Sequence, residues 1–108
     1  MRHRLDDLPA REVFPGFHGR FVHSGAMTFA WWTIDEGAEV PEHAHPHEQV
    51  VNMLEGELSL TVAGEEHVLH AGDVVTIPGR VRHAAKALAT SRVLDVFSPV
   101  REDYRFPV

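Results

Sequence analysis

The sequence predicts an all-β domain, a sandwich or barrel of short strands, and three observations support this fold class. Short runs of alternating or β-branched residues recur along the chain at a spacing of about ten residues. Turns that contain glycine or proline separate these runs. No segment longer than about ten residues repeats its apolar positions with the period of a helix, and glycine or proline interrupts every candidate. This combination is typical of all-β sandwiches and barrels.

The first three predicted strands lie in the first two thirds of the chain. Residues 26–34 (AMTFAWWTI) are rich in aromatic and β-branched side chains and end at Asp35-Glu36-Gly37. Residues 49–54 (QVVNML) run into a turn at Gly56. In residues 58–62 leucine and valine alternate with serine and threonine, which predicts a half-buried strand.

Three more strands are predicted in the second half. Residues 67–70 return after a turn, residues 74–77 form a short strand that ends at Pro78-Gly79, and residues 92–98 (RVLDVFS) end at Pro99. The first twenty residues and the last seven show no strand pattern. We expect these ends to be irregular and either to pack along the barrel or to exchange with a partner subunit.

Composition narrows the classes of protein. A chain of 108 residues with 44% hydrophobic and 24% charged residues predicts one globular domain over residues 1–108. The net charge of −6 and the absence of a basic cluster argue against nucleic acid or an anionic membrane as the main partner. No apolar stretch approaches the roughly 20 residues of a membrane helix. There are no cysteines and no secretory signal is visible, so the cytoplasm is the expected location.

Residues 41–49 (PEHAHPHEQ) concentrate side chains that can bind a metal ion. On a strand, residues i and i+2 point to the same face, so His43 and His45 should project together and form half of a divalent-metal site. Pro46 should bend the chain, which makes His47 an outer or pocket-mouth residue rather than a ligand. Gln49 opens the next strand and can return a carbonyl oxygen to the same place.

A third imidazole must come from elsewhere in the chain, and His83 stands just past Pro78-Gly79 at the end of an apolar strand. The alternative interpretation is that the histidines form an accidental polar cluster. For Gln49 the alternative is an amide that bonds to the backbone at the start of a strand.

Two spacings in the chain resemble the two motifs of the cupins. Motif 1 covers residues 37–56, as Gly37, five residues, His43-Ala44-His45, three residues, Gln49, six residues and Gly56. Motif 2 covers residues 72–87, as Gly72, five residues, Pro78 and then His83. The resemblance implies a single cupin double-stranded β-helix, or jelly-roll barrel. It also implies one metal ion in the barrel mouth, held by His43, His45, Gln49 and His83.

The chain departs from the cupin pattern at three positions. Gln49 stands where glutamate is usual, and Glu48 beside it is the alternative ligand, although counting back six residues from Gly56 favours Gln49. Arg80 and Ala87 replace a glycine and an asparagine of motif 2. Three histidines and a glutamine accept zinc, iron, manganese, nickel or copper, so the sequence leaves the identity of the metal open.

The last predicted strand carries an aspartate among apolar residues. Val93, Asp95 and Phe97 share one face, and burying the carboxylate is costly unless it is paired or used. Arg101 follows Phe97 by four residues, past Pro99, where the chain can return over the barrel mouth. A metal, an arginine and an aspartate suit a small oxygen-rich anion. The alternative is a structural ion pair between Asp95 and an arginine, Arg92 or Arg101.

Residues 41–49 and 95–103 (DVFSPVRED) are similar to the pectin-degradation cupins of the KdgF type. Those enzymes convert cyclic 4,5-unsaturated uronates, released by pectate or alginate lyases, into linear keto-sugar acids. Their catalytic aspartate, phenylalanine and arginine are spaced D-x-F-x-x-x-R, which Asp95, Phe97 and Arg101 match. The resemblance therefore implies a catalytic role for these three residues and a small anionic substrate, an unsaturated uronic acid.

Two other functions remain open from the sequence. The same ligands suit an Fe(II)-dependent dioxygenase-type cupin, and a cupin that binds a small molecule without chemistry is the third possibility. An exposed strand edge would favour pairing with a second copy, so we expect a homodimer.

Overall fold

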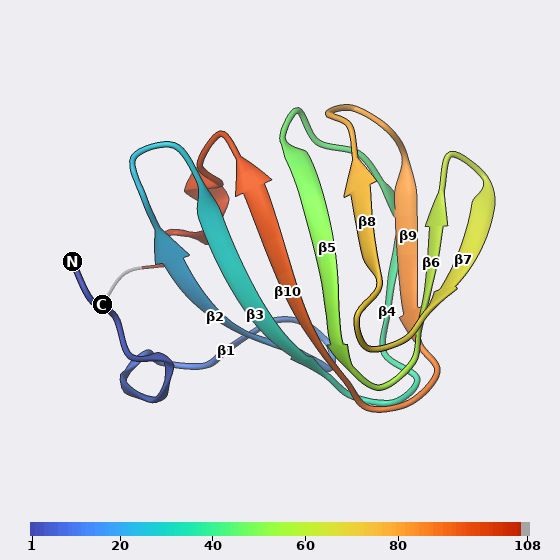
Figure 1. The fold of residues 1–108 in the computed structure, drawn as a ribbon, viewed down its shortest axis with the longest axis horizontal. Helices are drawn as coiled ribbons and strands as arrows, with labels where there is room; N and C mark the ends of the chain where they lie inside the picture. The colour runs from blue at the N-terminus through green and yellow to red at the C-terminus, as the bar shows by residue number, and fades with distance from the viewer. Residues whose placement is uncertain (107–108) are drawn as a thin grey trace.

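The computed structural model describes residues 1–106, which form two antiparallel sheets (Figure 1). The six-stranded sheet has the order β1 (Arg11–Phe14), β2 (Phe17–His23), β3 (Thr28–Ile34), β10 (Ser91–Ser98), β5 (Glu48–Glu55), β8 (Val74–Ile77). The four-stranded sheet has the order β4 (Glu39–His43), β9 (His83–Ala87), β6 (Leu58–Val62), β7 (Glu65–Leu69). Figure 1 shows the two sheets as the walls of a barrel whose strands converge at one end. The all-β prediction is confirmed.

Each of the six predicted strands is present, as β3, β5, β6, β7, β8 and β10, with ends shifted by at most two residues. The prediction that the first twenty residues are irregular is wrong. They contain a three-residue 3-10 helix, η1 (Leu5–Asp7), then β1 and most of β2, which pair with each other and with β3. The carboxyl-terminal end is closer to expectation, with one 3-10 helix, η2 (Glu102–Tyr104).

Gly19 explains why β2 shows no clear alternation in the sequence. It lies on β2 opposite Trp32 of β3. A Cβ atom at this position would stand 2.7 Å from the Trp32 ring and 2.7 Å from the Phe21 ring. The inward face of β2 therefore needs a position without a side chain, and that position removes an apolar residue from the pattern.

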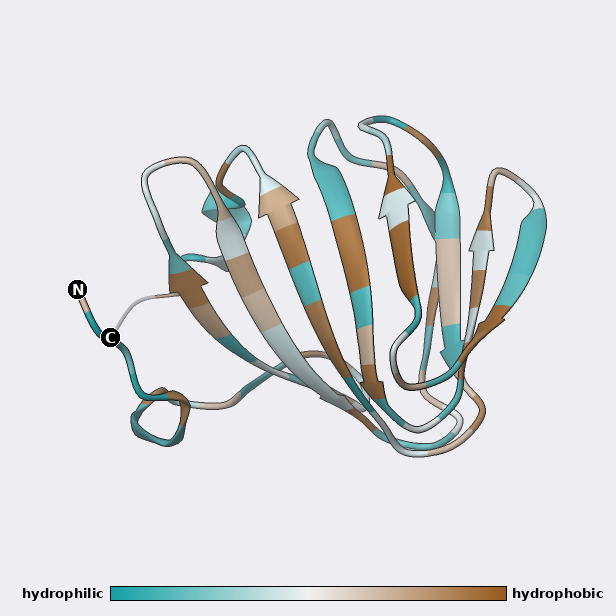
Figure 2. Ribbon diagram, in the orientation of Figure 1, coloured by the Kyte–Doolittle hydropathy of each residue, from teal (hydrophilic) through white to brown (hydrophobic). Residues whose placement is uncertain are grey.

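The core lies between the two sheets and is built from their inward faces. Bands of hydrophobic residues cross the strands of both sheets in Figure 2. Buried apolar residues come from the six-stranded sheet, from the four-stranded sheet and from η2; they include Trp32, Val51, Leu60, Phe97 and Tyr104. Each such side chain stabilises the fold by roughly 1.5–3 kcal/mol through the area it removes from water.

β10 is central to the six-stranded sheet and positions the chemistry. Its register places Asp95 between Ala30 of β3 and Val51 of β5. Phe97 lies between Thr28 and Gln49 in the same way. Ala30 is fully buried and small, which leaves room beside Asp95 for the larger side chain of Trp32, two residues further along β3.

Within residues 1–106, no helix has the length and hydrophobicity needed to cross a membrane.

Candidate metal centre

His43 and His83 meet because the strands that carry them are neighbours. β4 and β9 are antiparallel, and the register places His43 opposite His83. His45 lies two residues past the end of β4, so it approaches the pair from a loop rather than from the strand on which it was expected. One nitrogen from each of the three rings lies within 4.8 Å of the others. The two motifs therefore form one histidine triad.

The N–H groups of the three imidazole rings point away from the centre that the rings share. Each ring bonds through Nδ1 to a backbone carbonyl: His43 to Pro41 (2.9 Å), His45 to His47 (3.1 Å) and His83 to Val81 (2.8 Å). A carbonyl oxygen only accepts hydrogen bonds, so Nδ1 carries the proton and Nε2 carries a lone pair. Backbone carbonyls that hold Nδ1 in this way are typical of histidines that bind metal through Nε2.

His83 supplies the clearest sign that a group belongs at this centre. Its ring is buried, and its Nε2 atom has no hydrogen-bond partner among the described residues. Burial also lowers the pKa of His83, and that of His45 to about 4, where the charge of Arg101 adds to the effect. Both rings are thus neutral near pH 7, the form that binds a metal ion. The triad fits a divalent metal.

Gln49 adds an oxygen to the three nitrogens. Its Oε1 atom lies 3.1 Å from Nε2 of His45. Since Nε2 of the neutral His45 ring carries no proton, two lone pairs face each other, an arrangement that a cation between them would stabilise. Metal ligands stand at about 2.1 Å from the ion, so two ligands at a right angle are about 3 Å apart. The spacing matches neighbouring ligands on one ion.

Glu48, the alternative ligand, points the other way. Successive residues on a strand face opposite sides of the sheet, and Glu48 is exposed while Gln49 is buried. Gln49 is therefore the residue whose oxygen reaches the triad.

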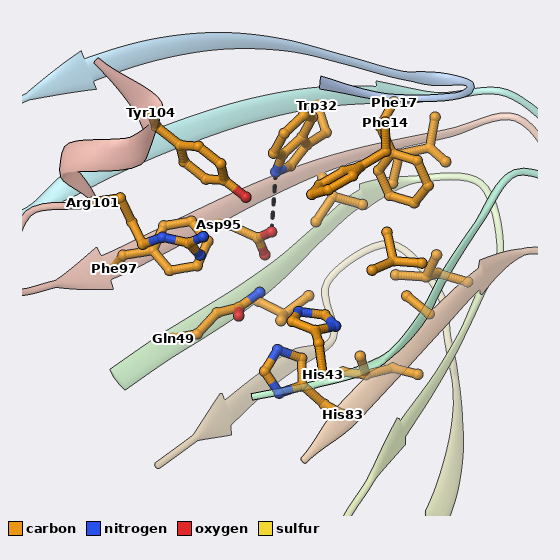
Figure 3. A pocket seen from close by; sticks show the side chains of 17 residues that line it. Phe14, Phe17, Trp32, His43, Gln49, His83, Asp95, Phe97, Arg101 and Tyr104 are labelled. Carbon is orange, nitrogen blue, oxygen red and sulfur yellow. Dashed lines mark hydrogen bonds between the residues drawn. The ribbon is translucent and has the colours of Figure 1, made fainter. Parts of the chain in front are cut away.

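Asp95 lies in the same pocket; the residue is half-buried, and its Oδ1 atom is shielded from solvent (Figure 3). Its Oδ2 atom accepts a hydrogen bond of 3.1 Å from the indole Nε1 of Trp32, whereas Oδ1 has no partner within residues 1–106. Burial raises the pKa of Asp95 to about 7, against the opposing effects of Gln49, Trp32 and Arg101. In Figure 3 the amide nitrogen of Gln49 is turned toward this carboxyl group.

Within the described residues 1–106, Asp95 does not form the structural ion pair that was the alternative interpretation. Arg92 pairs with Glu55 at 3.3 Å, and Arg101 pairs with Asp103 at 2.7 Å. Asp95 Oδ1 therefore faces the cavity without a hydrogen-bond partner among residues 1–106.

Phe97 and Arg101 complete one side of the pocket (Figure 3). The guanidinium carbon of Arg101 lies 4.8 Å from the centre of the Phe97 ring and 4.2 Å from that of Tyr104. The cavity of about 60 Å³ is polar on the side of these groups and of the triad, and apolar residues from both sheets form the remainder. The sequence-predicted residues His43, Gln49, His83, Asp95, Phe97 and Arg101 all line it, and His45 borders it through Phe97.

Two residues of the site lay outside the sequence-based prediction. Trp32 was one of two adjacent tryptophans on opposite faces, and only the structure shows that it is the one facing Asp95. Tyr104 sits in a segment expected to be irregular, and no strand period marks its orientation. His47 was expected outside the ligand set, and its carbonyl oxygen holds His45.

A barrel of two antiparallel sheets with three convergent imidazoles at one end belongs to the class of β-barrels that can hold a metal ion in the mouth. The sequence profile of the cupin domain matches residues 30–97, which is more than half of the chain. The chain therefore belongs to the cupin family, and the resemblance read from its two motifs is confirmed.

Two solved structures are similar to the chain over nearly its whole length. KdgF from Halomonas sp. is 29% identical with a TM-score of 0.88, covering 93% of this chain and 94% of its own. An RmlC-like cupin from Shewanella frigidimarina is 32% identical with a TM-score of 0.88, covering 93% and 91%. Ectoine synthase from P. lautus, at 20% identity and a TM-score of 0.82 over 94% and 79%, shares the fold alone. No curated protein sequence matches the chain significantly.

Proposed function

We propose that this cupin is a metal-dependent enzyme that converts cyclic 4,5-unsaturated uronates into linear keto-sugar acids during pectin or alginate breakdown. The observation that supports it most is the placement of Asp95, Phe97 and Arg101, spaced D-x-F-x-x-x-R, around the same cavity as the histidine triad. The similarity to KdgF from Halomonas sp. along 93% of the chain supports the same reaction.

In this proposal His43, His45, Gln49 and His83 hold one divalent transition metal: zinc, iron, manganese, nickel or copper. The metal supplies Lewis acidity toward the oxygens of the substrate. All four ligands are neutral, so they leave the full charge of the ion to act on an anionic substrate. A glutamate in place of Gln49 would reduce that charge.

Arg101 binds the substrate carboxylate, because a guanidinium is a planar fork that matches two carboxylate oxygens. The phenyl ring of Phe97 forms the pocket wall and holds the guanidinium against its face. The substrate thereby enters with its carboxylate toward Arg101 and its ring beside Asp95.

Asp95 transfers the proton. A group with a pKa of about 7 both gives and takes a proton near neutral pH, which suits it to acid and base roles in one reaction. Water adds across the enol ether, with its oxygen at C5 and a proton at C4. The hemiketal then opens to the C5 ketone, and the proton passes through Asp95 Oδ1, the oxygen with no partner in the described chain.

Loss of the ultraviolet absorbance of the alkene in 4,5-unsaturated galacturonate tests the proposal. The metal-loaded protein should accelerate it, and an Asp95→Asn variant should lose the rate while keeping its metal. Equal rates for the two proteins would contradict the proposed role.

Two further measurements distinguish the other two functions. Oxygen consumption with a diketone or thiol, found only in the iron-loaded protein, would assign a dioxygenase. Tight uronate binding without any product would assign a binding protein.

We further propose that the protein is a cytoplasmic homodimer. β1 and β8 end the six-stranded sheet, and β4 and β7 end the four-stranded one. Strand edges of this kind favour pairing with another copy. Sedimentation velocity at micromolar concentration should show a dimer, and a monomer would contradict it.

A further inference from the structure

The segment after β10 contains an ion pair that the proposed mechanism does not use. Arg101 donates two hydrogen bonds to Asp103, from Nε to Oδ1 at 3.0 Å and from Nη2 to Oδ2 at 2.7 Å. Both bonds use the same edge of the guanidinium, which leaves Nη1 outside the ion pair. Asp103 thus determines which edge of the arginine faces the cavity.

The backbone on both sides of this pair is held in place by β2 and β3. The Arg101 amide donates a hydrogen bond of 2.9 Å to Oγ1 of Thr28, a fully buried side chain. His23 contacts the Tyr104 carbonyl through Nε2 at 3.2 Å and Oγ1 of Thr28 through Nδ1 at 2.8 Å. The carbonyl only accepts, so His23 donates from Nε2 and accepts from Thr28 through Nδ1. In this series of hydrogen bonds, from the Arg101 amide through Thr28 and His23 to the Tyr104 carbonyl, every donor meets an acceptor.

The guanidinium also lies against two aromatic rings, Phe97 and Tyr104, which are nearly perpendicular to each other. The Phe97 and Tyr104 ring centres stand 4.8 and 4.2 Å from its central carbon, and only 9% of Arg101 is exposed. Ring contacts of this kind place the guanidinium but do not choose which of its N–H groups faces the cavity. Two hydrogen bonds from Arg101 to one carboxylate make that choice.

The ion pair contributes little to stability. The Asp103 side chain is 58% exposed, and ion pairs with an exposed partner are worth roughly 0–1 kcal/mol. Orientation of Arg101 is therefore the larger consequence of the contact.

We propose that Asp103 is a positioning residue that presents the Nη1 side of Arg101 to the carboxylate of a bound uronate. This inference rests on the proposed function, because it assigns the carboxylate to Arg101. It specifies the ligand further: recognition requires a free carboxylate, and a neutral ester of the same sugar lacks the acceptor that the oriented guanidinium binds.

Galacturonate, a saturated uronate that cannot react, is the probe, and its affinity for the metal-loaded protein is measured by calorimetry beside that of its methyl ester. We expect Asp103→Asn to raise the dissociation constant for galacturonate about tenfold and to leave the weak binding of the ester unchanged. Asp103→Glu should restore part of the affinity. Unchanged or tighter binding of galacturonate by Asp103→Asn would overturn the proposal, since tighter binding would mean that Asp103 competes with the ligand.

Glu102→Gln is the matched control. Glu102 pairs with Arg105 at 2.8 Å in the same 3-10 turn, and neither side chain lines the cavity. This variant should bind galacturonate as the unmodified protein does, and an equal loss of affinity in both variants would overturn a specific role for Asp103. The melting temperatures of both should stay near that of the unmodified protein.

Turnover of unsaturated galacturonate separates this inference from the proposed function. A raised KM with little change in kcat for Asp103→Asn supports both. The affinity pattern without turnover by any of the proteins supports the role of Asp103 and contradicts the reaction. Turnover with an unchanged KM in Asp103→Asn contradicts the role and leaves the reaction standing.

Discussion

Trp32 and Asp95 are 63 residues apart in the chain and are joined by a hydrogen bond from the indole Nε1 to the carboxylate Oδ2. The bond crosses from β3 to the central strand β10. It holds the carboxyl group in one orientation and leaves the other oxygen toward the cavity.

Replacing Trp32 by phenylalanine should therefore destabilise the protein and alter Asp95. The variant keeps an aromatic ring in the core and removes the only hydrogen bond that the described structure gives Asp95 Oδ2. A buried acceptor without its donor costs about 1–3 kcal/mol, which urea unfolding would detect. The pKa of Asp95 should rise further, because the indole bond favours the charged carboxylate, so the limb of the pH–rate profile that reports Asp95 should move to higher pH.

Trp31→Phe is the control for this variant. Trp31 is the neighbouring residue on β3, stacks on Phe29 and does not line the cavity. Its replacement should leave the pH profile unchanged, and equal shifts in the two variants would contradict the role of the indole bond.

The histidine triad should bind one metal ion per chain, and His83→Ala should abolish binding. Elemental analysis of the purified proteins measures the stoichiometry. Saturating metal should raise the stability of the unmodified protein, by about 2.7 kcal/mol at a concentration one hundred times the dissociation constant. His70→Ala, an exposed histidine paired with Glu57, should behave as the unmodified protein. Metal retention by His83→Ala would rule out this centre.

Gln49→Glu should keep the metal and lose activity. A carboxylate oxygen also binds divalent metals, but it would place a second negative charge beside the buried Asp95 and remove the amide group. The like charge would raise the pKa of Asp95, so we expect the rate at pH 7 to fall at least tenfold. Glu48→Gln, on the exposed face of the same strand, should keep both metal and rate. A loss of metal from Glu48→Gln instead would reassign the fourth ligand.

The metal-free protein should lose stability as the pH falls below 6.5. Burial lowers the pKa of His23, His45 and His83 in the folded state from the usual value of 6.5, and that of His45 to about 4. At these three histidines the unfolded chain therefore takes up protons first, so the stabilisation that they give above pH 6.5 is lost between pH 6.5 and about 4. The raised pKa of Asp95 acts in the opposite direction over the same range and offsets part of this loss. Urea unfolding with a chelator at a series of pH values measures this slope.

His23→Gln should make that slope shallower, because it removes one of the three groups. His3→Gln, in the exposed amino-terminal segment, should leave the slope as it is. A slope of unchanged steepness in His23→Gln would show that His23 takes up its proton equally in both states.

Strand periods and turn residues in the sequence were sufficient to predict the fold class and the six strands from β3 to β10 that carry clear patterns. Local chemistry determines these features: alternation defines a half-buried strand, and glycine ends it. The motif spacings likewise predicted that His43, His45 and His83 come together. In the structure, His43 on β4 and His83 on β9 stand opposite each other.

Contacts between distant segments determined the rest. The sequence does not identify β2 as a strand, because Gly19 interrupts its pattern. Only the structure shows that the Trp32 ring occupies the space where a side chain at Gly19 would lie. The alternating pattern places Trp31 and Trp32 on opposite faces of the strand but does not show which of them faces inward. The pairing of β3 with β10 determines this. The edge of Arg101 that faces the cavity is set by Asp103 and by two aromatic rings. The first two arrangements depend on side chains that meet only after the sheets close, so no local pattern in the chain encodes them. The partners of Arg101 lie within four residues of it, but the segment after β10 has no strand period that would show which way their side chains face.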